Sequence, residues 1–255
     1  MASGISFVKR VARRALPGPV IRWLGGRRPA DGFDPVGFAR TSGRSRRLEP
    51  LSREWGYDRG GPIDRHYVEA YLRSRASDIR GRVLEIGDDS YTRQFGGDRV
   101  EAVDILNVDE GDPRTTIVAD LAHAEHIPSG RFDCIIFTQT LHLIYEAGAA
   151  VETLRRILKP GGVLLATFPG ITRISWRELP GSWYWGFTSN SARRLFGDAF
   201  TPPAVEVESF GNVLAASAFL YGLGQDELSR AEFEHRDPEY EVVVAVRAVK
   251  PPEAA

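Results

Sequence analysis

The stretch Arg82-Val83-Leu84-Glu85-Ile86-Gly87-Asp88-Asp89 decides the fold of this 255-residue chain. A short aliphatic run passes through Glu85 and breaks at Gly87, and another acid, Asp104, follows about one strand-turn-strand unit later. This pattern is typical of a nucleotide-like cofactor held at the carboxyl edge of a parallel sheet. The glycine lets the backbone approach the ligand, and the acids accept hydrogen bonds from amine and hydroxyl groups.

Strand-like and helix-like segments alternate around this stretch. Strands separated by helices form a mostly parallel sheet that is covered on both faces, so we expect an α/β protein with a seven-stranded sheet. The expected strands are 83–86, 100–103, 115–119, 134–138, 163–168, 204–209 and 240–246, and the expected helices are 63–79, 147–158, 189–196 and 213–221.

Charge separates a basic arm from an acidic remainder. Residues 1–47 hold eleven Lys or Arg and two Asp or Glu, whereas the remaining residues carry a balance of −10. Apolar and basic residues interleave over 1–30, which fits either peripheral contact with an anionic membrane or a loosely docked arm. Charge alone would also suit nucleic acid, but no recognised binding module supports that partner.

Other features narrow the class of protein. The one cysteine, Cys134, excludes a disulfide framework within one chain. No run approaches the ~18 apolar residues of a membrane-spanning helix, and arginines interrupt any signal-peptide core, so we expect a cytoplasmic protein, at most membrane-peripheral. His123 and His126 have no third ligand at suitable spacing, so we expect no metal site.

Four motifs in this order resemble the class I S-adenosylmethionine-dependent methyltransferases over residues 81–248. The chain is similar in particular to a bacterial group with a Gly-Asp-Asp-(Ser/Thr)-Tyr-Thr variant of the first loop and the upstream segment 55–65. The resemblance implies a Rossmann-like sheet with its last strand antiparallel, and S-adenosylmethionine as the cofactor. The motifs are Val83-Leu84-Glu85-Ile86-Gly87, Asp104, Ala119-Asp120-Leu121, and the strand 132–136 followed by 154–162 with its Lys159-Pro160-Gly161-Gly162 turn.

The resemblance also assigns domains and cofactor contacts. It divides the chain into a basic extension and linker (1–62), a lid helix (63–80), the methyltransferase domain (81–248) and a tail (249–255). Its implied contacts are Glu85 organising the methionine-side loop, Gly87 approaching the methionine, Asp104 accepting the ribose hydroxyls, Asp120 and Leu121 binding adenine, and Thr138 and Gln139 facing the sulfonium and its methyl group.

The first loop departs from the family pattern. Asp89 and Tyr91 fill the second and third glycine positions, so two side chains stand where the backbone normally lies against the ligand. Asp89 could pair with the cofactor's ammonium group, and Tyr91 could close over the ligand or fill the pocket. A site that has lost cofactor binding is the alternative.

Several residues are candidates for contact with a methyl acceptor. His142, with an ordinary pKa of ~6.5, could take a proton from an acceptor hydroxyl near neutral pH, or it could be structural. His66 lies on the lid helix. The segment 176–187 follows the fifth strand, and its Trp183, Tyr184 and Trp185 suit ring stacking, a membrane interface or a packed cover equally.

These features together favour a methyltransferase that acts on a small-molecule or glycan hydroxyl, lipid-linked acceptors included. Two alternatives stay open. A non-catalytic methyltransferase-like binding or scaffold protein would fit the altered first loop. Another nucleotide-using α/β enzyme, such as a dehydrogenase, is disfavoured because the glycine fingerprint is incomplete and no Tyr-x-x-x-Lys pair occurs.

Overall fold

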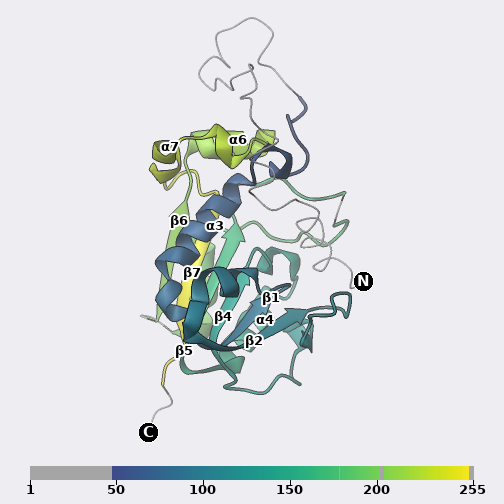
Figure 1. The fold of residues 1–255 in the computed structure, drawn as a ribbon, viewed down its shortest axis with the longest axis vertical. Helices are drawn as coiled ribbons and strands as arrows, with labels where there is room; N and C mark the ends of the chain where they lie inside the picture. Colours follow the sequence, from purple (N-terminus) through teal and green to yellow (C-terminus); the bar gives the residue numbers. More distant parts are fainter. Residues whose placement is uncertain (1–47, 178, 202–203, 253–255) are drawn as a thin grey trace, which may run out of the picture.

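The computed structural model describes residues 48–252 except 178, 202 and 203, so the predicted membrane-binding segment 1–30 lies outside the described residues. A seven-stranded sheet in the order β3-β2-β1-β4-β5-β7-β6 forms the centre (Figure 1). β1 to β5 pair in parallel, and β7 is antiparallel to both neighbours. The expected Rossmann-like sheet is confirmed. Its strands are β1 (Gly81–Ile86), β2 (Val100–Asn107), β3 (Ile117–Val118), β4 (Phe132–Thr138), β5 (Leu158–Pro169), β6 (Val205–Phe210) and β7 (Val243–Val249).

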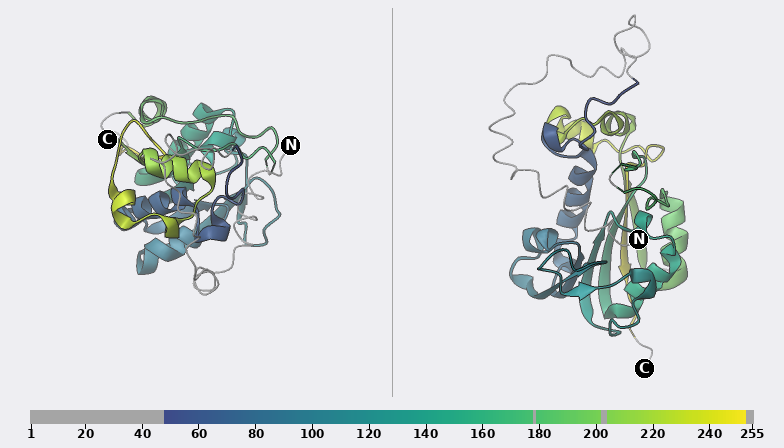
Figure 2. Two further views of the ribbon diagram at one scale, coloured as in Figure 1. Left: turned by 90° about the horizontal axis from the view of Figure 1, so that it is seen from above. Right: turned by 90° about the vertical axis from the view of Figure 1, so that its right-hand side faces the viewer.

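Helices cover both faces of the sheet, as the right-hand view of Figure 2 shows. α3 and α6 share one apolar core, to which β1, β4 and β5 contribute alternate side chains, and α4 and α5 share the other core. Burial on both faces explains why the central strand reads as a continuous apolar run. The helices are α3 (Ile63–Ser74), α4 (Ala147–Ile157), α5 (Ser189–Phe200), α6 (Val213–Tyr221) and α7 (Arg230–Glu234), with short turns η2 (Tyr57–Arg59), η3 (Ala76–Asp78), η4 (Thr92–Gly96), η5 (Gly97–Arg99), η6 (Leu121–His123), η7 (Leu141–Leu143) and η8 (Gln225–Glu227).

The segment that precedes α3 packs against the segment that follows α6. The N–H of Leu51 donates to the carbonyl of Tyr221 at 2.8 Å, and the N–H of Gln225 donates to the carbonyl of Gly61 at 2.9 Å. Arg59 and Glu227 form an ion pair between the two segments. Residues 51–62 are therefore part of the folded unit, although the sequence suggests a linker there.

Several elements differ in length from the expectation: β3 is shorter, β5 and α5 are longer, and β2 and the first helix differ for reasons that the contacts show. β2 continues to Asn107 instead of ending at 103, because the carboxylate of Asp104 is paired within the sheet and does not need solvent. The helix expected over 63–79 ends at Ser74, whose hydroxyl donates to the carbonyl of Tyr71, and the short turn η3 follows. α7 had no counterpart among the expected helices.

Candidate active site

The first loop leaves β1 at Gly87 and turns sharply into η4. Gly87 has φ +86°, in the left-handed region that favours glycine, and its N–H donates to the carbonyl of Leu106 at 2.9 Å. Below it, the buried carboxylate of Glu85 accepts from the N–H groups of Tyr91 (3.1 Å) and Thr92 (2.8 Å). Glu85 therefore organises the loop from beneath, and a negative charge there suits the N–H groups that open a helical turn.

A cavity, here called the β2-side cavity, lies at the carboxyl ends of β1, β2 and β4. Its apolar wall includes Ile86, Leu106, Leu121 and Ile144, and Asn107, Asp120 and Thr140 are polar residues that line it. Apolar walls with a few polar groups suit a flat purine nucleoside.

Two of the expected adenine contacts lie in this cavity. Asp120 is exposed, caps η6 by accepting from the N–H of Ala122 at 3.0 Å, and lines the cavity. Leu121 is buried behind it. Their placement follows from the end of β3, where the chain turns at the edge of the sheet.

Asp104 lies elsewhere. It sits inside β2 beside Leu84, not at the strand's end, and its carboxylate contacts Arg82 (2.7 Å), Arg131 (3.2 Å) and Thr116 (3.1 Å). The hydrogen bonds from Arg82 and Thr116, with the charge of Arg131, outweigh burial and hold its pKa below the usual range. Asp104 therefore belongs to an ion-pair cluster within the sheet. It does not line the β2-side cavity, so its expected contact with the ribose is corrected.

Asn107 occupies the strand end where the acid was expected. It is buried, lines the β2-side cavity, and its Nδ2 donates to Thr115 Oγ1 at 2.7 Å and to the carbonyl of Gly87 at 3.4 Å. An amide can accept and donate hydrogen bonds, so its Oδ1 is suited to a ribose hydroxyl.

A second cavity, here called the aromatic cavity, opens between α3, the first loop and the segment 169–183. Both residues expected near the sulfonium, Thr138 and Gln139, line it, as does His142. The remaining charged and aromatic lining residues include Trp55, Tyr57, Asp64, Arg65, Tyr91 and Trp183.

Gln139 and His142 are the polar groups of this cavity that protein atoms leave unsatisfied. Within the described part of the chain, Gln139 Nε2 and His142 Nδ1 are buried without a hydrogen-bond partner. Gln139 also has φ +47°, a strained value for a non-glycine residue. Buried polar atoms without partners require an explanation, and a bound ligand supplies one.

His142 is uncharged at neutral pH. Its ring is 4% exposed and its centroid lies 4.2 Å from that of Trp183, and burial lowers its pKa to about 3. The expectation of a histidine that titrates near neutral pH is therefore wrong, because burial in an apolar environment penalises the imidazolium.

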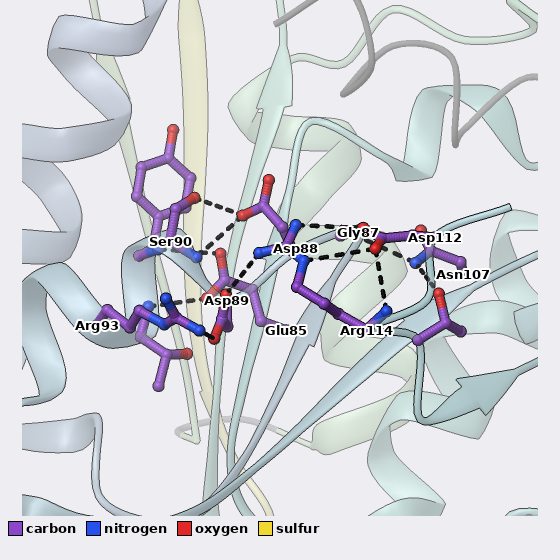
Figure 3. A network of polar contacts seen from close by, with 12 residues as sticks. Glu85, Gly87, Asp88, Asp89, Ser90, Arg93, Asn107, Asp112 and Arg114 are labelled. Atoms are coloured by element: carbon purple, nitrogen blue, oxygen red, sulfur yellow. Dashed lines mark hydrogen bonds and ion pairs between the residues drawn. The ribbon is translucent and has the colours of Figure 1, made fainter. Parts of the chain in front are cut away.

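Asp89 faces two arginines instead of either cavity (Figure 3). Its carboxylate lies 2.6 Å from Arg93 Nη2 and 3.3 Å from Arg114 Nη1. The acid of this loop that lines the aromatic cavity is its neighbour Asp88, which also accepts from the N–H of Ser90 at 2.9 Å. Asp88 is therefore better placed than Asp89 for the expected pairing with an ammonium group.

Tyr91 forms part of the wall of the aromatic cavity. Its ring stacks on Phe95 at 6.2 Å between centroids, and the guanidinium of Arg65 lies 5.9 Å from its centre. Burial raises the pKa of the Tyr91 hydroxyl, so the phenol stays neutral. The side chain at the third glycine position thus adds to the cavity wall.

The other expected acceptor residues are spread over different surroundings. Trp183 lines the aromatic cavity, and Tyr184 lines the β2-side cavity. Trp185 stacks on Tyr145, and its Nε1 donates to the carbonyl of Ile144 at 3.0 Å. These contacts fit the packed cover that was one of the expectations for this segment. His66 stacks on Phe233 at 3.9 Å between ring centroids instead of lining either cavity of the described structure.

Sequence reasoning missed the contribution of the segment 55–65. Trp55 stacks nearly parallel to Trp183, with 6.2 Å between centroids, and the guanidinium of Arg173 lies 3.8 Å from its ring centre. Asp64, in the first turn of α3, lines the cavity, and burial raises its pKa to about 6. The segment 55–65 contributed to the resemblance described above, but its position over the cavity cannot be inferred from the sequence.

Comparison with known proteins agrees with this geometry. Residues 84–166, from β1 to β5, match the family model described as a methyltransferase domain. No curated protein matches the chain.

Similar solved structures include the following two methyltransferases. A phosphoethanolamine N-methyltransferase 2 from Haemonchus contortus, in complex with phosphomonomethylethanolamine and S-adenosylhomocysteine, is 16% identical over 98% of this chain and 61% of that one, with a TM-score of 0.51. An S-adenosylmethionine-dependent methyltransferase from Mesorhizobium loti is 17% identical over 74% and 98% of the two chains, with a TM-score of 0.49.

The match over residues 84–166 and the shared fold agree with a methyltransferase domain that uses S-adenosylmethionine as its cofactor. The two cavities fit that molecule. The β2-side cavity suits its nucleoside, and the unsatisfied Gln139 Nε2 lies in the aromatic cavity beside it.

Proposed function

We propose that this protein transfers a methyl group from S-adenosylmethionine to a hydroxyl of a small-molecule or glycan acceptor, lipid-linked acceptors included. One observation carries the proposal. Gln139 Nε2 and His142 Nδ1 are buried without hydrogen-bond partners in the aromatic cavity, beside the β2-side cavity. Both groups follow β4, the strand that separates the two cavities.

The chain's own residues divide the work of holding the cofactor. Asn107, Asp120 and Leu121 would hold its nucleoside, and Asp88, Thr138 and Gln139 would hold its methionine side. Gly87 would let the first loop approach the methionine. When bound, the cofactor supplies an electrophilic methyl group on a sulfonium. Asp88 would place a carboxylate near the ammonium group, which favours the charged pair in a partly desolvated site.

The acceptor would lie between the rings of the aromatic cavity. Trp55, Tyr57 and Trp183 give flat faces for a sugar or another ring and exclude water. His142, being neutral, would orient the acceptor hydroxyl by one hydrogen bond instead of storing its proton. Such orientation can provide most of the acceleration in an in-line displacement, in which the acceptor oxygen would gain the methyl group that the sulfonium gives up and the hydroxyl proton would pass to water.

We also propose peripheral contact with anionic membrane through residues 1–30, based on the basic and apolar pattern of that segment. No helix in the described part of the chain is long and apolar enough to cross a membrane. A cytoplasmic, membrane-peripheral location remains part of this proposal.

Methyl-labelled S-adenosylmethionine tests the proposed reaction. Incubation of the purified chain with extracted small-molecule, glycan and glycolipid fractions should move label into one of them, and the label should survive mild alkali because a methyl ether, unlike an ester, resists hydrolysis. Trp183→Ala should lose most of the transfer, and Trp176→Ala, on an exposed part of the same segment, should keep it. Label found only in protein or nucleic acid would exclude this acceptor class.

A further inference from the structure

The charge of Asp89 is neutralised by an ion-pair cluster at the base of the first loop (Figure 3). The Asp89 side chain is 11% exposed, that of Arg93 71% and that of Arg114 41%. A nearly buried carboxylate needs such partners, because its removal from water without them is strongly unfavourable. Replacing glycine by aspartate in this loop therefore creates a requirement for nearby cations.

Arg114 meets that requirement from a different loop. It lies in the connection between β2 and β3, and its Nη2 and Nε also contact Asp112 at 3.2 Å and 3.4 Å. The Asp112 side chain is 8% exposed, so both carboxylates that share this guanidinium are nearly buried. One side chain thus links the loop after β1 to the loop after β2.

The backbone of the first loop does not itself require the missing glycines. In the described chain the non-glycine residues with positive φ are Trp55, Gln139 and Thr201, and Tyr91 has φ −74°. Gly87 is the position of this loop that needs the left-handed region. Side chains can therefore stand at the second and third glycine positions, provided that their contacts hold the loop in place.

We propose that Arg114 is a positioning residue for the cofactor, and that the Asp89–Arg114–Asp112 bridge replaces the second loop glycine in fixing the first loop beside the β2-side cavity. The inference rests on the proposed function, since that cavity is assigned to the cofactor's nucleoside. The hydrogen bond from Asn107 to the carbonyl of Gly87 joins the same two loops and aligns the cavity's polar residues with them.

A double-mutant cycle tests this coupling by calorimetric titration with S-adenosylhomocysteine. Arg114→Ala should weaken binding roughly tenfold, as expected when a charged hydrogen bond that orders a site is lost. In the Asp89→Gly background the same substitution should have no further effect on binding, because the contact between Arg114 and the first loop is already lost. Equal losses in both backgrounds, or none in the parent, would overturn the proposal.

Arg93→Ala is the matched control, because Arg93 pairs with the same carboxylate but belongs to the same loop. It should change the affinity far less than Arg114→Ala. Arg114→Lys keeps the charge but cannot contact both carboxylates in the same planar geometry, so it should restore only part of the affinity. Equal effects of Arg93→Ala and Arg114→Ala would mean that charge neutralisation, not the link between loops, matters.

Amide hydrogen exchange of the free protein gives a readout that does not depend on the cofactor. Arg114→Ala should speed exchange at residues 88–93 in the parent and leave it unchanged in Asp89→Gly. If the parent protein binds no S-adenosylhomocysteine, the proposed function fails, and the exchange data still decide whether the bridge fixes the loop. Unchanged exchange in Arg114→Ala would exclude the bridge.

Discussion

Among single residues, His142 shows how burial changes the chemistry of a motif. Its ring lies against Trp183, with Nδ1 unsatisfied within the described structure, and burial lowers its pKa to about 3. In the proposed reaction the side chain would therefore act as neutral imidazole, and its contribution would be orientation of the acceptor.

The same shift predicts a pH dependence of stability. The unfolded chain binds a proton at His142 near pH 6.5 and the folded chain does so only near pH 3, so stability falls as pH decreases through that window. Between pH 7.5 and pH 5 the parent should lose about 2 kcal/mol more unfolding free energy than His142→Asn, which cannot titrate. Urea denaturation at both pH values measures the difference, and identical losses would show that His142 is not buried in neutral form.

Asn107 lies at the strand end where the resemblance places an acid, and Asp104 lies inside the strand. Asp104→Asn should lower the unfolding free energy by about 1–3 kcal/mol, because Arg82 and Arg131 lose their charged partner, and should leave the affinity for S-adenosylhomocysteine unchanged. Asn107→Ala should weaken that affinity. Denaturation and titration of both variants separate the two effects, and loss of binding in Asp104→Asn alone would restore the original assignment.

Residues at strand ends could be predicted from the sequence, and residues with distant partners could not. Gly87, Asp120 and Gln139 lie at the sheet edge because each follows a clear apolar strand. The resemblance placed Asp104 at a strand end, yet its partners are Arg82 in β1 and Arg131 just before β4. No local pattern in the sequence predicts such an ion-pair cluster.

At the scale of elements, the segment 51–62, which covers the aromatic cavity, is held by close backbone packing. The carbonyl of Arg59, at the end of η2, lies so near Gly224 that a Cβ there would be 1.7 Å from it. The same two segments are joined by the Arg59–Glu227 ion pair and by the bridge between Pro62 and Gly224. The position of Trp55 over the cavity follows from this packing.

Gly224→Ala should therefore displace residues 51–62 from their packed position. We expect a loss of about 1–3 kcal/mol in unfolding free energy and faster proteolysis within 51–62, since the added methyl group has no space. Gly148→Ala is the control: nothing lies near its Cβ position in α4, and alanine there should add about 0.5–1 kcal/mol. Similar stability of the two variants would contradict the packing.

The order of strands and helices could be predicted from the alternation of apolar runs. The packing of residues 51–62 over the aromatic cavity could not. Segments such as 134–138 and 163–168 are apolar because both faces of the central sheet are buried, which any α/β protein of this kind requires. Residues 51–62 carry Gly, Arg and Pro, and their order comes from contacts with α6 and η8, far along the chain.

At the scale of the whole molecule, the proposed contact with an anionic membrane rests on the basic and apolar pattern of residues 1–30. In vesicle flotation the full chain should bind anionic but not neutral vesicles, and salt should weaken the binding. Arg13→Glu with Arg14→Glu should reduce flotation, and Arg193→Glu with Arg194→Glu, an adjacent pair exposed on α5, should not. Equal loss in both variants would show that only net charge matters.

The central claim is that the two cavities form a working S-adenosylmethionine site despite the altered first loop. Isothermal titration of the full chain with S-adenosylhomocysteine tests it most directly, with NAD titrated in parallel. We expect saturable one-to-one binding of S-adenosylhomocysteine that Asn107→Ala weakens, and no binding of NAD. Absence of heat from S-adenosylhomocysteine at millimolar concentration, or saturable binding of NAD in its place, would contradict the account.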